Sequence, residues 1–104
     1  MIDGEQITLG GTEYTLPPLP LRPMAKVQPV MARTTDIYAE EYIEAFTFGL
    51  WASLKLNYPD ITREQVENNV YVTNALPLMQ AFMRVNGFIA KAADAPAGEP
   101  TADQ

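Results

Sequence analysis

Three carboxylates at helical spacing come nearest, by type and position, to a chemical site in this chain. Asp36, Glu40 and Glu44 repeat every fourth residue, which places them on one face of a helix. A divalent cation needs several oxygen ligands that converge from a shaped loop, and a catalytic carboxyl pair needs one buried member with a raised pKa. Carboxylates along an exposed helix meet neither condition. We therefore interpret the set as a solvated face, with electrostatic docking of a basic partner as the alternative.

The composition argues against catalysis by a side-chain nucleophile. The 104 residues include no histidine and no cysteine, and Ser53 is the single serine. Ser53 thus lacks an imidazole partner, and thiol nucleophiles, disulfides and thiolate or imidazole metal sites are excluded. Gly10-Gly11 lacks the lysine-containing frame of a phosphate-binding loop. The sequence predicts a protein that is not an enzyme and that holds no cofactor and no metal.

Charge and hydropathy narrow the class of partner. Thirteen acidic against seven basic residues give a net charge of -6, which disfavours nucleic acid and anionic lipid as partners. We find no apolar run long enough to cross a membrane, and the first residues do not read as a secretory leader. We therefore expect no nucleic-acid partner, no membrane association and a cytoplasmic location.

Other patterns suit binding to proteins. The segment 17–22, PPLPLR, matches a polyproline ligand, although it also serves to join two structural elements. Four methionines at helical spacing fit a core better than an adaptable binding surface. We expect a partner to bind the wide aromatic side of the long helix, at Tyr42, Phe46 and Trp51. Trp51→Ala should then weaken binding without unfolding the protein, whereas global unfolding would show that Trp51 belongs to the core.

The elements that position these residues follow from local patterns. We expect a mainly α fold with an N-terminal β-hairpin (α+β), built as a small bundle of three to four helices. One globular domain should span residues 1–91, and residues 92–104, which lack a large apolar side chain, should form a disordered tail. The expected elements are a hairpin over residues 6–16, turning at Gly10-Gly11, and helices over about residues 21–33, 36–57, 62–69 and 74–91.

Finer features of the helices are also predicted. Apolar stripes run along the two longest helices; they comprise Ile43, Phe46, Leu50 and Leu54, and Leu78, Phe82, Val85 and Ile89. Pro29 should kink or shorten the helix over residues 21–33. Gly49 should mark a close helix contact, and Thr62 with Gln65 should form a capping box.

Three segments of the chain carry a family resemblance. Residues 7–19 read ITLGGTEYTLPPL, residues 54–66 read LKLNYPDITREQV, and residues 86–88 read NGF. The first resembles an opening LGGxxYxLPPL element, and the second is similar to a mid-chain NYPD(I/L)TxExV turn. Their order and spacing resemble those of the tail assembly chaperones of long-tailed (siphovirus-like) bacteriophages and prophages.

This resemblance implies a role in virion assembly. Such chaperones bind the tape measure protein, keep it soluble and help to recruit subunits of the major tail (tube) protein. The resemblance further implies self-association, a place in the host bacterial cytoplasm and absence from the mature virion. The alternative is another small acidic adaptor or inhibitor of phage or bacterial origin. A mimic of nucleic acid is disfavoured because the carboxylates concentrate in one middle segment and the C-terminal tail.

Overall fold

The computed structural model describes residues 1–89 and has a two-stranded hairpin followed by four helices. This confirms the predicted small α+β fold. The strands are β1 (Glu5–Leu9) and β2 (Thr12–Leu16), and the helices are α1 (Leu21–Arg33), α2 (Glu40–Asn57), α3 (Arg63–Glu67) and α4 (Val72–Val85). The predicted tail over residues 92–104 lies outside the described residues.

The hairpin forms because two glycines satisfy its turn. Gly10 and Gly11 have φ values of 60° and 79°, and a type I′ turn requires positive φ at both central positions. The strands pair antiparallel, with Leu9 opposite Thr12. The alternation buries Leu9 and Leu16 on the face that packs against the helices.

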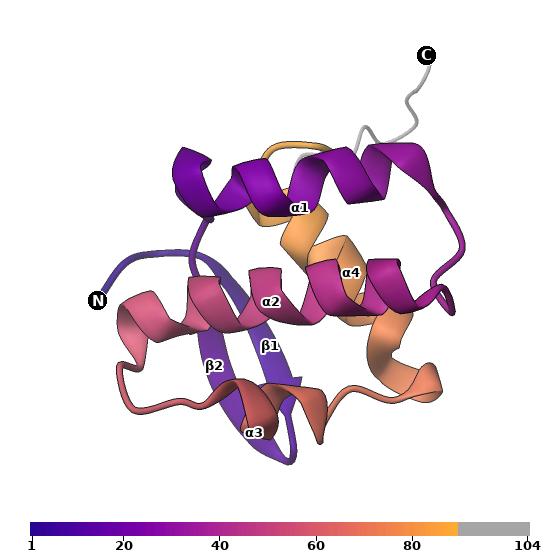
Figure 1. Ribbon diagram of the computed structural model, residues 1–104. Helices are drawn as coiled ribbons and strands as arrows, with labels where there is room; N and C mark the ends of the chain where they lie inside the picture. The colour runs from indigo at the N-terminus through magenta and orange to yellow at the C-terminus, as the bar shows by residue number, and fades with distance from the viewer. Residues whose placement is uncertain (90–104) are drawn as a thin grey trace, which may run out of the picture.

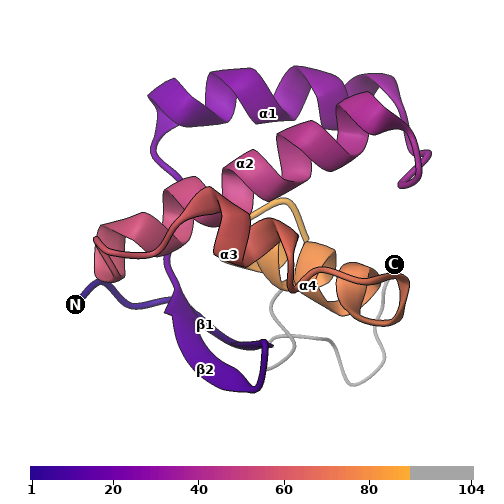
Figure 2. The same cartoon turned by 60° about the horizontal axis from the view of Figure 1, so that its bottom comes forward.

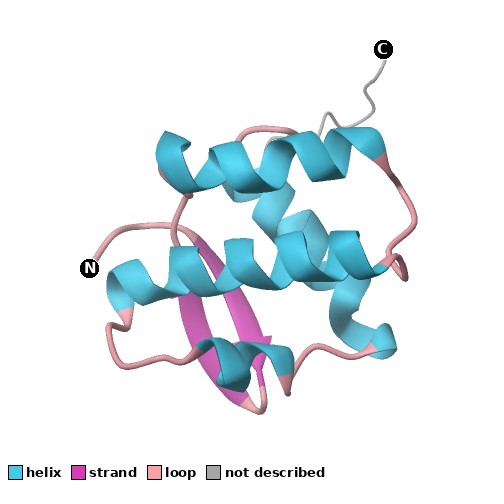
Figure 3. Cartoon of the chain, in the orientation of Figure 1, coloured by secondary structure: helices cyan, strands magenta, loops and turns pink. Residues whose placement is uncertain are grey.

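Helix α2 is the centre of the fold. It runs antiparallel to α1, and the hairpin lies on its other side (Figures 1 and 2). It also contacts α3, while α4 packs against β1 behind it. In Figure 3, α2 crosses in front of the small sheet, which it contacts through β2. This arrangement surrounds α2 with neighbours along most of its length.

The core confirms the predicted close contact at Gly49. Phe46, Leu50 and Leu54 of α2 are buried with Phe82 of α4. A Cβ atom at Gly49 would lie 3.1 Å from Cζ of Phe82 and 3.4 Å from a methyl of Val27. The missing side chain therefore allows α1, α2 and α4 to approach one another.

The start of α2 differs from the prediction. The helix begins at Glu40 rather than at residue 36. The Asp36 carboxylate accepts a hydrogen bond of 3.0 Å from the backbone N–H of Tyr38, which holds residues 36–39 in a turn. The predicted stripe was also wrong at Ile43, which is exposed, because the adjacent Tyr42 faces the core instead.

The end of α4 differs as well, since the prediction carried this helix to residue 91. The N–H of Phe88 bonds to the carbonyl of Met83 at 2.8 Å, and the N–H of Gly87 bonds to that of Arg84 at 3.1 Å. With Gly87 at a φ of 83°, these two bonds form a Schellman motif, which ends the helix at Val85. Ile89, predicted to continue the stripe, is exposed beyond this end.

The remaining helices are close to their predictions. Helix α1 has the predicted bounds, and Pro29 does not shorten it; Pro29 lies on the exposed side. Helix α3 is shorter than residues 62–69, but the capping box of Thr62 and Gln65 is confirmed. The first residue of α4 is Val72 rather than residue 74, because the Asn74 side chain accepts a bond of 2.6 Å from the N–H of Tyr71.

Candidate functional site

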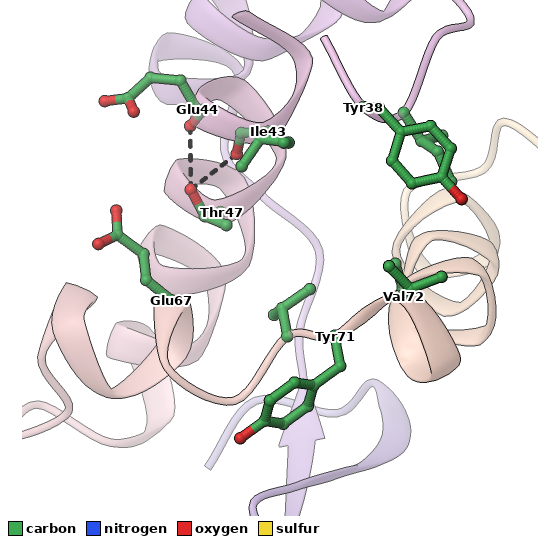
Figure 4. Close-up of a pocket in the computed structure, with 10 residues that line it drawn as sticks. Tyr38, Ile43, Glu44, Thr47, Glu67, Tyr71 and Val72 are labelled. Carbon is green, nitrogen blue, oxygen red and sulfur yellow. Dashed lines mark hydrogen bonds between the residues drawn. The ribbon is translucent and has the colours of Figure 1, made fainter. Parts of the chain in front are cut away.

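An apolar groove of about 380 Å³ lies between the first half of α2 and the segment that joins α3 to α4. Ile43 and Thr47 of α2 line one side, and Tyr71 and Val72 line the other (Figure 4). The turn before α2 adds Tyr38. Three stretches that are distant in the sequence thus meet around one concave surface.

The groove gathers large apolar side chains that face water. Tyr38, Tyr71 and Val72 are 66%, 60% and 69% exposed, and Ile43 is also exposed. Single exposed apolar residues are normal on a protein surface, but several gathered around one concavity make it a candidate binding site. The observation therefore favours a ligand or partner with its own apolar surface.

Local hydrogen bonds hold these side chains in place. The turn at Asp36 positions Tyr38, and Asn74 bonds through its amide to the carbonyl of Asn69 at 2.9 Å and, as described above, to the backbone of Tyr71. Thr47 donates its hydroxyl to the carbonyl of Ile43 at 2.8 Å. The hydroxyl of Thr47 and the side-chain amide of Asn74 are thus engaged within the protein.

A smaller cavity of about 50 Å³ continues from the groove toward the core. It shares Ile37, Ile43 and Val70 with the groove and extends to Phe46 and Met79. The site thus has an open outer part and a narrow inner part, which we call the inner cavity.

Tyr42 also lines the inner cavity. Its hydroxyl donates to the sulfur of Met79, and burial raises the pKa of the phenol above its usual 10.0. The phenol therefore stays neutral through the physiological range.

Two carboxylates form one rim of the groove. Glu44 and Glu67 lie on one side of the pocket in Figure 4, with Tyr38 and Val72 on the other. Arg63 bridges the carboxylates, with its guanidinium 2.9 Å from Glu44 and 3.3 Å from Glu67. These three side chains together carry a formal charge of -1, and Lys26 lies on the adjoining surface with Glu44 and Arg63.

The structure separates the three residues predicted to bind a partner. Tyr42 and Phe46 are buried, at 5% and 4% exposure, and contribute to the inner cavity rather than to an exposed face. Trp51 lies farther along α2 and does not line the groove; its indole N–H donates to the carbonyl of Ile61 at 3.1 Å. Lys55 covers the indole, with its ammonium 4.9 Å from the ring centre.

The acidic residues interpreted as a solvated helix face do not all lie on α2, because Asp36 precedes its first residue, Glu40. Asp36 is used in the turn, and Glu44 pairs with Arg63. Within residues 1–89 the structure has no cluster of carboxylates that could hold a metal ion. The described helices also include none long and apolar enough to span a membrane.

Sequence reasoning missed Tyr38, Tyr71, Val72 and Glu67 as groove residues. One signal was present: Val70-Tyr71-Val72 is a run of three large apolar residues between two predicted helices. Such a run outside a helix must either join the core or remain exposed. Here Tyr71 and Val72 remain exposed.

The segments that carry the family resemblance meet away from the groove. Asn57 bonds to the backbone of Ile2 and to the carbonyl of Thr15 at 3.2 Å, and Tyr58 packs edge-on against Tyr14.

The third segment makes a similar contact, since the Asn86 side chain accepts a bond of 2.8 Å from the N–H of Leu19. These motif residues therefore stabilise the junction of hairpin and helices. No model of a protein family, no curated protein and no solved structure matches this chain.

Proposed function

We propose that this protein is a non-enzymatic chaperone of phage tail assembly that binds an apolar segment of the tape measure protein in the groove. The observation that supports a binding function is the cluster of exposed Tyr38, Ile43, Tyr71 and Val72 around one concave surface. The identity of the partner rests on the resemblance of the three sequence segments to tail assembly chaperones.

The groove suits a helical segment of a partner. An amphipathic helix buries its apolar face by lying in a hydrophobic groove, and tyrosine is enriched among the residues that dominate such interfaces. Burying the tyrosines and the exposed valine against a partner removes apolar surface from water on both sides. A long apolar protein would thereby be shielded before the tail tube forms around it.

Further parts of the proposal follow from the resemblance. The chaperone would help to recruit subunits of the major tail tube protein, would self-associate and would act in the host bacterial cytoplasm without entering the mature virion. The net charge of -6 is compatible with this role, because it disfavours binding of the chaperone itself to nucleic acid.

Co-expression with the tape measure protein of the same phage or prophage tests the proposal. The measurement is the amount of tape measure protein that stays soluble and co-purifies with a tag on this chain. The double variant Tyr38→Ala with Tyr71→Ala should lose most of the captured protein, since both side chains line the groove and are exposed.

Leu21→Ala is the matched control. Leu21 is 87% exposed but lies on α1, away from the residues that line the groove. The Leu21→Ala variant should capture as much tape measure protein as the wild type. The proposal is overturned if the wild type leaves the tape measure protein insoluble, or if the double variant captures it as well as Leu21→Ala does.

A further inference from the structure

The inner cavity is lined mainly by apolar side chains. Its volume of about 50 Å³ exceeds the roughly 15 Å³ that one water molecule needs. The two hydroxyls at its wall are already engaged, because Thr47 donates to the carbonyl of Ile43 and Tyr42 donates to the sulfur of Met79. A water molecule would find few partners there, whereas an aliphatic side chain would contact Phe46 and Met79.

The rim next to the cavity carries two exposed carboxylates. Glu44 follows Ile43 in the chain, and Ile43 lines both the groove and the inner cavity. The carboxylates of Glu44 and Glu67 are 69% and 46% exposed and share the single guanidinium of Arg63. One lysine or arginine of a partner would balance the remaining negative charge.

From these two features we infer which segment the groove selects. We propose that it binds an amphipathic helix that inserts one aliphatic side chain into the inner cavity and places a lysine or arginine beside Glu44 and Glu67. This inference rests on the proposed binding function and adds the chemistry of the bound segment. A helix suits this site, because residues three or four positions apart lie on the same helix face. The inserted aliphatic side chain and the lysine or arginine can then both reach the site.

Occupants from this chain fit the site poorly. Residues 92–104 contain three acidic residues, no basic residue and no large apolar residue, so they supply neither the anchor nor the cation. A second copy carries the same net charge of -6 and is disfavoured at this acidic rim, so the proposed self-association would use another surface. Charge complementarity therefore favours a different protein with a basic amphipathic segment.

The test uses a fluorescent synthetic helix-forming peptide with leucine on one face and lysine on the other, titrated with the full chain and followed by anisotropy. A twin peptide carries glutamate at every lysine position. Ala75→Leu fills the site, because Ala75 lines both the groove and the inner cavity. Ala25→Leu is the control, since Ala25 is exposed on α1 and lines neither.

We expect the lysine peptide to bind the wild type and Ala25→Leu alike. Ala75→Leu should bind it about tenfold or more weakly, as expected when an anchor side chain is blocked. The glutamate peptide should bind the wild type about tenfold more weakly than the lysine peptide, and added salt should reduce that difference. Circular dichroism of both leucine variants verifies that they fold.

Other results would overturn the inference. They are no binding of the lysine peptide to the wild type, equal binding of the two peptides, or unchanged binding to a folded Ala75→Leu. The outcome is separable from the proposed function. If Ala75→Leu still captures the tape measure protein, the chaperone role stands and the insertion of an aliphatic side chain is rejected. If the wild type binds the lysine peptide but does not capture the tape measure protein, the insertion stands and the chaperone role is rejected.

Discussion

The hydroxyl of Tyr58 accepts a hydrogen bond of 2.8 Å from the backbone N–H of Thr15, although 43 positions separate the two residues. Tyr58 directly follows α2, and Thr15 lies in β2. The bond satisfies a part-buried donor of the strand, and the Tyr58 ring packs edge-on against Tyr14, 5.0 Å between ring centres. One side chain thus joins the central helix to the hairpin.

Tyr58→Phe should lower the free energy of unfolding by about 1–2 kcal/mol, because it leaves the Thr15 N–H without its acceptor. In a domain of this size that loss corresponds to a fall in melting temperature of roughly 4–8 °C per kcal/mol. Thermal unfolding followed by circular dichroism measures it. Tyr71→Phe is the control, because Tyr71 is exposed and its hydroxyl makes no hydrogen bond within the described part of the chain. Equal melting temperatures for the two variants would contradict the role of the Tyr58 hydroxyl.

Gly49→Val should destabilise the fold by about 2–3 kcal/mol relative to Gly49→Ala. A single Cβ already meets Phe82 at 3.1 Å, so the two further methyl groups of valine require the helices to separate. For Gly49→Ala, a gain in helix propensity of about 1 kcal/mol offsets much of the tight contact. Urea denaturation of both variants gives the difference. If valine is tolerated as well as alanine, the helices are not in close contact at this position.

Ser53→Ala should raise the free energy of unfolding by about 1 kcal/mol. The Ser53 side chain is fully buried, and its Oγ atom has no hydrogen-bond partner among residues 1–89. Burying an unpaired hydroxyl costs free energy that alanine does not incur, and alanine also favours helix. Ser53→Thr retains the hydroxyl and adds a methyl group to a packed site, so it should be less stable than the wild type. Chemical denaturation of the three proteins should rank them alanine, serine, threonine.

Stability should fall in alkaline solution partly through Tyr42. Burial raises the pKa of this phenol in the folded protein above its usual 10.0, so the unfolded chain loses the proton first. The contribution of the protonated Tyr42 phenol to the free energy of unfolding is fully present below pH 10 and is lost as the pH rises through the folded-state pKa. Tyr42→Phe has no proton to lose, so its free energy of unfolding should decline less above about pH 10. Denaturation curves at neutral and alkaline pH compare the two proteins, and parallel declines would contradict the assignment.

The position of Trp51 in the structure makes Trp51→Ala a poor test of partner binding. The indole N–H bonds to the carbonyl of Ile61, and the partly buried ring packs against the core. Trp51→Ala therefore removes structural contacts, and a loss of binding in that variant would not separate docking from folding. Tyr38 and Tyr71 are better probes because they are exposed around the groove.

Several elements were predictable because local chemistry decides them. Gly10-Gly11 specifies a two-residue turn, and Thr62 with Gln65 specifies the start of α3. The Asn86-Gly87 stop of α4 is equally local and was overlooked in favour of the apolar period that continues to Ile89. A glycine at positive φ ends a helix even where apolar residues continue at helical spacing. The N–H groups of the glycine and of the next residue then bond to carbonyls of the last helical turn.

The sequence by itself determined the hairpin, the order of the helices, an acidic chain without histidine or cysteine, and the need for a core around α2. The tertiary structure alone decided which side of α2 is buried. Large apolar side chains lie on several sides of this helix, so their spacing does not define one buried face. They are Tyr42, Ile43, Phe46, Phe48 and Trp51. The positions of α1, the hairpin and α4 turn Tyr42 inward and leave Ile43 outside.

The groove also exists only in three dimensions. Tyr38 and Tyr71 lie on segments 33 positions apart, and neither segment belongs to a predicted apolar stripe. A concave site requires both segments to be held at a distance from each other, and that distance is set by the packing of α2, α3 and α4. Local sequence patterns describe neighbours along the chain, whereas this site is formed by neighbours in space.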